Sequence, residues 1–374
     1  MKKIKFHAFL LFIVLYLLFP YFISCDKENV SDKKSEDQLN IGAWYFGGWS
    51  FPSNQDGYSY HITPTLTTQF SYREPVWGWR EDKMDVMTQQ INYAADAGLS
   101  FWGFCWYENT LSPNPTFMDY LNTALDLFIK APNKNRLNFF LLSSEPVSRY
   151  SWNTLCEKTI KLFSESNYLR VDGKPIIMFF NTDELIENLG GVSGIHEAFN
   201  IYREKARKAG IGEIMIGART WPLKGDLKKY QERLESCGFD FLTTYHNGYN
   251  GDPGENDYEK LIQSDKWVWD KVPSNTALKY IPVLTTGYDM RPWAIDRPTL
   301  PASNFWFSHA TPTGIANHLR DAIEWTKSNN NKVLNNMIIM YAWNENGEGG
   351  WLTPTKSEGN TRLEEIKKVI DEYK

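Results

Sequence analysis

The chain has 374 residues, with 40 Lys and Arg against 45 Asp and Glu, a formal net charge of −5 at pH 7 and 15% aromatic residues. This acidic balance argues against nucleic acid or another polyanion as a partner. Beyond residue 25 the cysteines are Cys105, Cys156 and Cys237, widely spaced and without a CxxC pair, so no metal or disulfide framework is expected. Cys105 lies in an apolar segment and is predicted to be an inert core residue.

Residues 1–24 have the features of a signal peptide. Three lysines, at positions 2, 3 and 5, precede an apolar run from Phe6 to Phe22. The alternative is a membrane-spanning anchor, but the run is short for ~20 apolar residues and Pro20 interrupts its end. A processed leader is therefore preferred, and its loss removes three lysines and takes the net charge from −5 to −8.

Phe22-Ile23-Ser24-Cys25 resembles a bacterial lipobox, in which the Cys25 thiol would carry the lipid. Residues 25–38 are polar and charged, cannot form a core and are predicted to be a flexible tether. Such a start is similar to surface lipoproteins of the Bacteroides type. The resemblance implies an extracytoplasmic protein held on the outer membrane through its lipid anchor only, on the cell surface or the periplasmic face.

From residue 39 onward, apolar segments rich in β-branched and aromatic residues alternate with amphipathic ones. The predicted strands are 40–46, 99–107, 137–144, 174–181, 213–219, 239–246, 279–286 and 336–343. The predicted helices are 82–97, 116–130, 151–166, 193–209, 226–237, 256–271, 313–327 and 360–373. Asp82, Ser151 and Asp226 are predicted N-caps, and Gly98 and Gly210 follow predicted helix ends.

Eight strands alternating with eight helices predict a (β/α)₈ TIM barrel, an α/β fold in which residues 39–374 form a single domain. The alternative is an open doubly wound sheet. The cofactor signature usual in that fold, GxGxxG after the first strand, is not matched by Gly42, Gly47 and Gly48. No cofactor is expected.

A barrel places its chemistry where strands end and βα loops begin. Polar and aromatic residues follow most of the predicted strands, which predicts one polar rim. Two long loops, residues 47–81 and 287–311, are rich in Trp, His and Arg. They are predicted to form the walls of a substrate cleft, the alternative being scaffolding over the barrel mouth.

The densest group of carboxylates at a strand end is Asn344-Glu345-Asn346-Gly347-Glu348-Gly349-Gly350-Trp351. Its glycines permit a tight backbone path, so both glutamates can face one small volume, with Trp351 as a wall. Two carboxyl groups in different environments supply the acid and the base of glycoside hydrolysis. The alternative, a solvated acidic turn, is weakened by the apolar strand that leads to the pair.

Residues 344–354 resemble the C-terminal signature of glycoside hydrolase family 99 and its relatives labelled WbsX-like, which reads roughly Asn-Glu-Trp-x-Glu-Gly. Residues 41–49 are similar to that family's aromatic first strand, and residues 89–107 to its first helix and second strand. The resemblance spans most of residues 40–374. It implies a retaining, endo-acting glycosidase, typically an α-mannosidase or mannanase, that degrades a polysaccharide or glycan.

The resemblance also implies roles for the two catalytic carboxylates. Glu345 would deprotonate the substrate 2-hydroxyl, which attacks the anomeric carbon and gives an anhydro-sugar intermediate. Glu348 would be the general acid and then the base for water. No metal is required.

The chain departs from the family pattern at Asn346, where Trp is usual, at Gly347, where His or Ala is usual, and at Thr353, where Glu is frequent. The carboxylates, and with them the reaction class, are retained. More familiar barrel glycosidases place an acid as Asn-Glu at the end of strand four. Here that place reads Asn181-Thr182, which favours the pair at strand eight.

Further residues at the rim are predicted to bind substrate hydroxyls or stack on sugar rings: Tyr45, Trp106, Tyr107, Tyr245, His246, Tyr288, Asp289, Asn344 and Trp351. His246 is expected to orient a neighbour rather than to bind metal. Glu145 and Asp183 are reserve acids, and Arg219 is expected to form an ion pair with one of them.

Three other functions remain open. A non-catalytic glycan-binding surface lipoprotein would keep the aromatic cleft but would not need Glu345 and Glu348. A glycosyltransferase-like enzyme would use an activated sugar, yet no phosphate-cradling loop is apparent and a leader suits it poorly. A structural surface protein would not explain polar groups at strand ends. The expected partner is a carbohydrate, and the expected state is a monomer.

Overall fold

The protein is described here by a computed structural model that covers residues 38–50, 60–108, 119–249, 251–299 and 303–374. The predicted signal peptide, Cys25 and all of the predicted tether except Gln38 lie outside the described residues. Residues Gln38–Lys374 form one compact unit. Within the described ranges, no helix combines the length and the apolar character that crossing a membrane requires.

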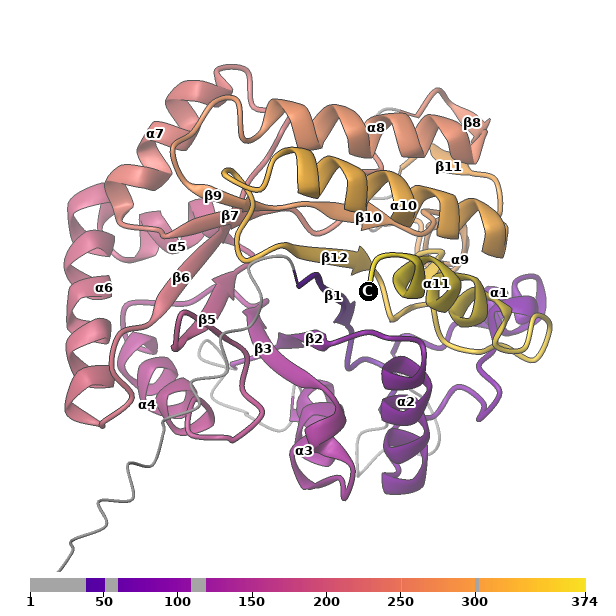
Figure 1. Ribbon diagram of the computed structural model, residues 1–374, viewed down its shortest axis with the longest axis horizontal. Helices are drawn as coiled ribbons and strands as arrows, with labels where there is room; N and C mark the ends of the chain where they lie inside the picture. The colour runs from indigo at the N-terminus through magenta and orange to yellow at the C-terminus, as the bar shows by residue number, and fades with distance from the viewer. Residues whose placement is uncertain (1–37, 51–59, 109–118, 250, 300–302) are drawn as a thin grey trace, which may run out of the picture. The chain divides into compact units, whose positions relative to one another are not determined.

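Parallel strands form a closed barrel at the centre of this unit (Figure 1). The path runs β10-β12-β1-β2-β3-β5-β6-β7-β9. The strands are β1 (Asn40–Tyr45), β2 (Phe101–Trp106), β3 (Asn138–Ser143), β5 (Lys174–Phe179), β6 (Met215–Arg219), β7 (Phe241–Thr243), β9 (Lys279–Ile281), β10 (Val283–Thr285) and β12 (Met337–Tyr341). The predicted (β/α)₈ barrel is confirmed.

The predicted strand 279–286 is divided into β9 and β10 at Pro282. Proline has no N–H to give to a ladder, so the strand is interrupted there. The Pro282 carbonyl still accepts a hydrogen bond from the Ile339 N–H at 3.0 Å. Because β9 pairs with β7 and β10 pairs with β12, the two halves together act as the seventh barrel strand and complete the closure.

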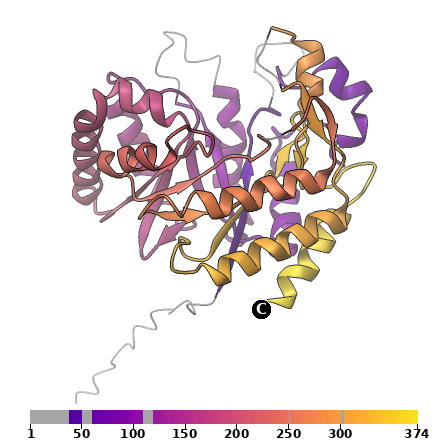
Figure 2. The ribbon, with the colours of Figure 1, turned by 90° about the horizontal axis from the view of Figure 1, so that it is seen from above.

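The predicted helices all form and surround the barrel (Figures 1 and 2). Most ends shift by a few residues, but the predicted helix 116–130 becomes α-helical only at Thr123, and residues 116–118 lie outside the described residues. They are α2 (Met84–Asp96), α3 (Thr123–Lys130), α4 (Trp152–Leu162), α6 (Gly191–Lys208), α7 (Leu227–Cys237), α8 (Tyr258–Lys271), α10 (Pro312–Ser328) and α11 (Thr361–Glu372). Short elements that were not predicted lie in the connections: α1 (Pro64–Thr68), α5 (Thr182–Asn188), α9 (Arg291–Asp296), β4 (Arg170–Val171), β8 (Gly254–Asn256) and β11 (Phe305–Phe307).

One of the three predicted N-caps is confirmed. The Asp226 carboxylate accepts a hydrogen bond from the Lys229 N–H at 3.0 Å. Asp82 does not cap α2, because Lys83 occupies the N-cap position and Asp82 binds Arg80 instead. Ser151 occupies the N-cap position of α4, but its hydroxyl bonds to Ser148 outside the helix. Short polar side chains bond whichever backbone group is nearest, so the pattern alone does not fix the partner.

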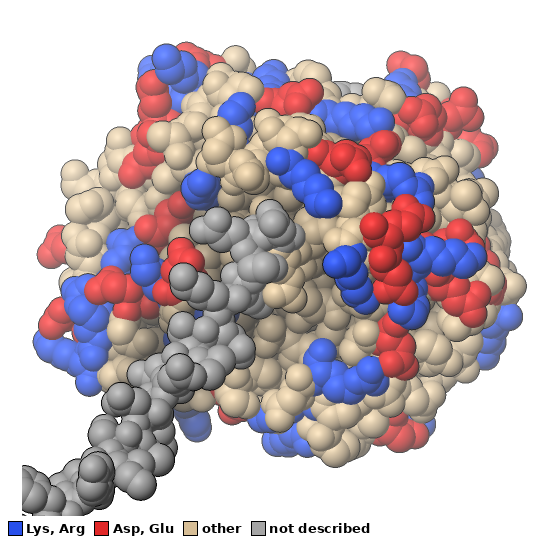
Figure 3. Space-filling model, in the orientation of Figure 1, with Lys and Arg blue, Asp and Glu red and all other residues tan. Residues whose placement is uncertain are grey.

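Aromatic side chains fill much of the core between the strands and the helices. Trp102 packs against Trp343, with ring centroids 5.1 Å apart, and against Tyr45 at 5.0 Å. The Trp343 indole N–H donates to the Gln90 amide oxygen at 2.7 Å. These tryptophans are fully buried, so part of the high aromatic content serves packing rather than ligand binding. On the face shown in Figure 3, basic and acidic side chains are interspersed.

The Asp226 cap gives a stability prediction. Asp226→Ala should lower the free energy of unfolding by about 1 kcal/mol, because it leaves a helix N–H without its acceptor. Asp257→Ala is the matched control, since Asp257 holds the N-cap position of α8 without a side-chain capping bond. Urea denaturation followed by circular dichroism measures both. Equal losses in the two variants would contradict the capping role.

Candidate active site

The predicted carboxylate pair lies in a tight hairpin at the carboxyl end of β12. Strand β13 (Asn344–Glu345) pairs antiparallel with β14 (Gly350–Trp351), and the Glu348 N–H donates to the Glu345 carbonyl at 3.0 Å. Gly349 has φ +85°, and a Cβ there would lie 2.7 Å from the Asp289 backbone nitrogen. Glycine is therefore required at this position, as the sequence predicted for the turn.

Asn344 ties this hairpin to the end of β1. Its side-chain oxygen accepts from the Phe46 N–H at 2.7 Å, and its amide nitrogen donates to the Phe46 carbonyl at 2.8 Å. The same nitrogen donates to the Glu81 carboxylate at 2.7 Å. The Tyr45 hydroxyl also donates to Glu81, at 3.0 Å. Asn344 and Tyr45, both predicted to bind substrate, thus support the site from behind.

Glu81 was not identified from the sequence. Burial raises its pKa to about 7, against the opposing effect of its hydrogen bonds from Asn344 and Tyr45. It lies in the long loop after β1, and no sequence pattern marks an isolated glutamate in a loop as part of a site. Only the fold places it next to Asn344 beneath the hairpin. Its role here is to hold Asn344, and through Asn344 the backbone that carries Glu345.

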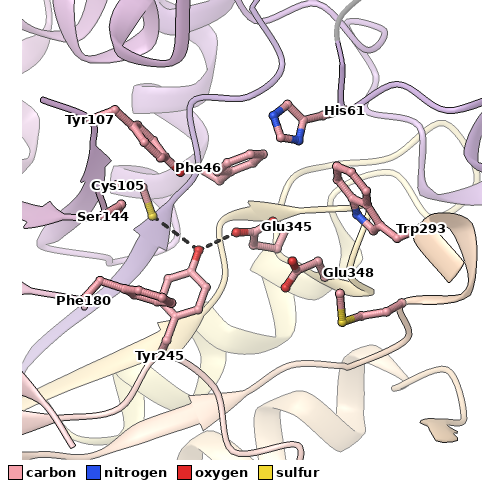
Figure 4. Close-up of a pocket in the computed structure, with 11 residues that line it drawn as sticks. Phe46, His61, Cys105, Tyr107, Ser144, Phe180, Tyr245, Trp293, Glu345 and Glu348 are labelled. Carbon is pink, nitrogen blue, oxygen red and sulfur yellow. Dashed lines mark hydrogen bonds between the residues drawn. The ribbon is translucent and has the colours of Figure 1, made fainter. Parts of the chain in front are cut away.

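Both glutamates face a cavity of about 320 Å³, a volume suited to a small ligand group (Figure 4). Its remaining walls are largely aromatic and come from strand ends and from the two long loops. The lining residues are Phe46, His61, Cys105, Tyr107, Ser144, Phe180, Tyr245, Met290, Trp293, Glu345 and Glu348. The long loops thus contribute walls, as predicted, through His61, Met290 and Trp293.

Glu345 is only 5% exposed and accepts a hydrogen bond from the Tyr245 hydroxyl. Burial and the neighbouring Glu348 carboxylate raise its pKa well above the usual range, and the bond from Tyr245 opposes this. The Cys105 thiol lies 3.4 Å from the same hydroxyl. Figure 4 shows this chain of contacts from β2 across the barrel to the hairpin.

Glu348 accepts a hydrogen bond of 2.5 Å from the Tyr341 hydroxyl. Burial raises its pKa, and the bond from Tyr341 opposes the rise. Two neighbouring carboxyl groups are costly to ionise together, which adds to the effect of burial on Glu345. The pair therefore offers one acid and one base.

Cys105 was predicted to be inert core, and it is buried, but it also lines the cavity. Burial, followed by the Glu345 charge, raises its thiol pKa to about 12. The thiol thus stays protonated and is a poor nucleophile.

Of the other predicted substrate-binding residues, Tyr107 and Tyr245 line the cavity with the glutamates. Trp106 is 5% exposed and does not line it. His246 packs flat on Tyr288, with ring centroids 4.7 Å apart, and burial lowers its pKa to about 3. It is therefore neutral and does not line the cavity, and its orienting role stays a prediction.

Tyr288, Asp289 and Trp351 line a second, polar hollow of about 150 Å³ rather than the main cavity. Asp289 forms ion pairs with Arg73 and Arg291, and the bonds from these two arginines hold its pKa below the usual range despite burial. Two guanidinium groups face one carboxylate, so these three groups together keep a net positive charge. Three of the nine predicted binding residues thus belong to a different surface.

The sequence departures lie together. The Asn346 amide donates to the Thr353 hydroxyl at 3.3 Å and to the Arg73 carbonyl at 2.7 Å, and neither Asn346 nor Thr353 lines the cavity. Gly347 acts differently, because a Cβ there would lie 2.9 Å from the Trp293 indole nitrogen. The glycine allows Trp293 to approach the cavity.

The reserve residues pair differently from the prediction. Asp183 pairs with Lys224 at 2.9 Å and with Arg233 at 3.3 Å, not with Arg219. Arg219 instead lies between two aromatic rings, and Glu145 forms no ion pair among the described residues. Neither reserve acid lines the cavity.

Sequence reasoning placed His61 and Trp293 in the cleft loops but not in the site. Their ring centroids are 5.2 Å apart, and burial, followed by the charge of Arg297, lowers the His61 pKa to about 3. Phe180 and Ser144, at the ends of β5 and β3, were also missed, since in sequence the first is an ordinary core residue and the second an ordinary loop residue. In the ranges that the structure describes, no cluster of three or more His, Cys, Asp or Glu side chains forms a metal-binding group.

The chain is similar in fold to solved barrels. One is the GH99 endo-alpha-mannosidase from Bacteroides thetaiotaomicron in complex with bis-tris-propane, with a TM-score of 0.57 and 15% identity over 90% of this chain and 98% of that one. Another is a glycoside hydrolase-like protein, with a TM-score of 0.58 and 17% identity over 89% and 94%.

No functionally curated sequence matches the chain significantly. The family model described as glycosyltransferase WbsX matches residues 53–366, most of the barrel and both candidate carboxylates. The chain therefore belongs to the WbsX family.

Proposed function

We propose that this chain is a glycoside hydrolase that uses Glu345 and Glu348. The observation that carries the proposal is the carboxyl pair at the barrel mouth, with Glu345 buried and Glu348 half-buried, each bonded by a different tyrosine hydroxyl. Cleavage of a glycosidic bond needs an acid for the leaving oxygen and a base for the attacking group, and two carboxyl groups in one cavity can supply both.

The proposed route is the neighbouring-group one. Glu345 removes the proton of the substrate 2-hydroxyl, whose oxygen attacks the anomeric carbon as Glu348 protonates the leaving oxygen. Water then opens the anhydro-sugar, with Glu348 taking its proton and Glu345 returning one to the 2-oxygen. Tyr245 and Tyr341 hold the two carboxylates in place and favour their ionised forms.

The proposed substrate is a polysaccharide or glycan, with endo-acting α-mannosidase chemistry as the first expectation. The similar fold of an endo-alpha-mannosidase supports this choice. The cavity supports it as well, because aromatic walls such as Phe46, Tyr107 and Trp293 suit the C–H faces of sugars.

Glycosyl transfer is the second candidate, favoured by the family description. A nucleotide-sugar donor carries a diphosphate, which needs cations or a cradle of backbone N–H groups. Among the residues that the structure describes, the cavity lining contains two carboxylates and no Lys or Arg, so its charge opposes such a donor. A glycan-binding protein without catalysis is the third candidate, and it has no need of the two carboxyl groups.

Activity should depend on both carboxyl groups. On α-mannans, rhamnose-containing polysaccharides and host glycans, the chain from residue 38 should release oligosaccharides. Glu345→Gln and Glu348→Gln should each lower kcat by at least ~100-fold, because each removes one proton-transfer group. Chromatography of the products measures this, and Glu145→Gln is the control. Retained activity in both variants would exclude this site, binding without cleavage would favour glycan capture, and product formation only from nucleotide sugars would favour transfer.

The tyrosines should set the pH dependence. Tyr245→Phe removes a donor to Glu345 and raises its pKa, so the acid limb of kcat/KM moves to higher pH by about one unit. Tyr341→Phe raises the pKa of Glu348, so the alkaline limb moves to higher pH. Tyr107→Phe is the control, as Tyr107 lines the same cavity without a described bond to either glutamate. If neither variant shifted its limb of the pH profile of kcat/KM, Tyr245 and Tyr341 would not set the pKa values of the two glutamates.

We also propose that Cys25 is lipidated and holds the protein on the outer membrane. The motif at residues 22–25 and the polar stretch after it support this. In cells, Cys25→Ser should move the protein from the membrane to the soluble fraction and abolish incorporation of a labelled fatty acid, whereas Cys105→Ser should change neither. Membrane retention with no label would point to an uncleaved anchor instead.

A further inference from the structure

Arg219 ends strand β6, at the same rim of the barrel as the two glutamates. The residue is 6% exposed. Its guanidinium carbon lies 3.7 Å from the ring centroid of Phe180 and 3.6 Å from that of Trp221. The cation is thus held between two aromatic faces, a geometry that keeps the guanidinium plane fixed and leaves its edge for hydrogen bonding.

Within the described residues, the guanidinium has no counter-ion and no hydrogen bond, and its Nε is enclosed without a partner. Asp183, the nearby acid, is already shared by Lys224 and Arg233. Burial lowers the pKa of Arg219 to about 10, which leaves it charged at neutral pH. A buried charge without a partner is costly, so folding alone does not explain its presence here.

Two other buried arginines show what structural pairing looks like in this protein. Arg362 donates to the Glu358 carboxylate at 2.8 Å and to the Trp351 carbonyl at 2.9 Å. Arg73 donates to Asp289 and to the Asn346 carbonyl. Both are bonded to carboxylates and carbonyls, whereas Arg219 is not, although all three are nearly inaccessible.

Arg219 also lies beside the main cavity. Phe180, one face of the Arg219 stack, lines that cavity (Figure 4). The Phe180 ring lies edge to face with Tyr245, with centroids 5.2 Å apart, and Tyr245 donates to Glu345. Arg219 is not among the residues that line the cavity, but its guanidinium packs on a ring that does, so it lies one aromatic ring away from a glycan bound there.

We propose that Arg219 determines specificity by binding an anionic group, the carboxylate of a uronic acid or a sulfate ester, on the sugar that adjoins the cavity. The inference rests on the proposed glycan-cleaving function and narrows its substrate to acidic glycans. A guanidinium binds carboxylate or sulfate oxygens with two parallel N–H donors, and Trp221 offers a surface for the sugar ring.

The test compares matched polymers and matched arginines. Acidic polysaccharides that contain uronic acid or sulfate are used beside their carboxyl-reduced and desulfated forms. On the acidic form, Arg219→Gln should lower kcat/KM by about 10- to 100-fold, the loss expected for hydrogen bonds to a charged group. The kcat/KM of Arg219→Lys should lie between those of Arg219→Gln and the native chain. Arg233→Gln, which changes a neighbouring arginine that already has an ion-pair partner, should have the native kcat/KM. Whether carboxyl reduction or desulfation abolishes the preference identifies the anion.

Thermal unfolding of Arg219→Gln shows whether this variant folds. If it does not fold, Arg219→Lys is used in its place, because lysine keeps the positive charge but cannot donate two parallel hydrogen bonds. If the ratio of kcat/KM on the acidic polymer to that on the neutral polymer were the same in the native chain and in all variants, the inference would be overturned. The proposed glycoside hydrolase function would still stand. Calorimetry with the Glu348→Gln chain separates the two proposals. Acidic glycan that binds only when Arg219 is present, with no cleavage by the native chain, would support the inference and refute the hydrolase. No binding of any acidic form would overturn the inference.

Discussion

The pairing of β12 with β1 is the constraint on which the rest of this structure depends. It closes the barrel, with Asn40 opposite Met337 and Ala43 opposite Met340. The chain that leaves β12 must then run beside the end of β1, where Asn344 bonds to both backbone groups of Phe46. Both glutamates inherit their position from this closure, because they follow within a few residues of the last strand.

The site gains its chemistry from burial. In water, neither glutamate would hold a proton at neutral pH, and neither tyrosine hydroxyl would be a reliable donor. Within the barrel mouth, burial raises both carboxyl pKa values, and Tyr245 and Tyr341 limit the rise. The same burial makes an arginine without a partner costly at the rim, so we infer that Arg219 binds a ligand. Arg73 and Arg362 are buried too, but their hydrogen bonds to backbone carbonyls and carboxylates fit a structural role.

The residues at which the chain departs from its family's pattern divide into two kinds. Asn346 and Thr353 bond to each other behind the hairpin and do not line the cavity. Gly347 makes room for Trp293 at the cavity. Asn346 and Thr353 thus affect the contacts that hold the hairpin in place. Gly347 affects the cavity wall that a sugar would contact. A sugar in the cavity would therefore contact Trp293 and not Asn346.

The sequence by itself determined the barrel, because alternating apolar strands and amphipathic helices repeat along the chain with local signals that need no partner. It also located the glutamate hairpin, since Glu345, Glu348 and their glycines are neighbours in the chain. Only the tertiary structure decided which rim residues share the cavity. Tyr45, Asn344 and His246 end strands as Tyr107 and Tyr245 do, yet they turn behind the wall. Side-chain direction, the partner that Arg219 lacks and the buried Glu81 depend on contacts between residues far apart in sequence, which no local pattern encodes.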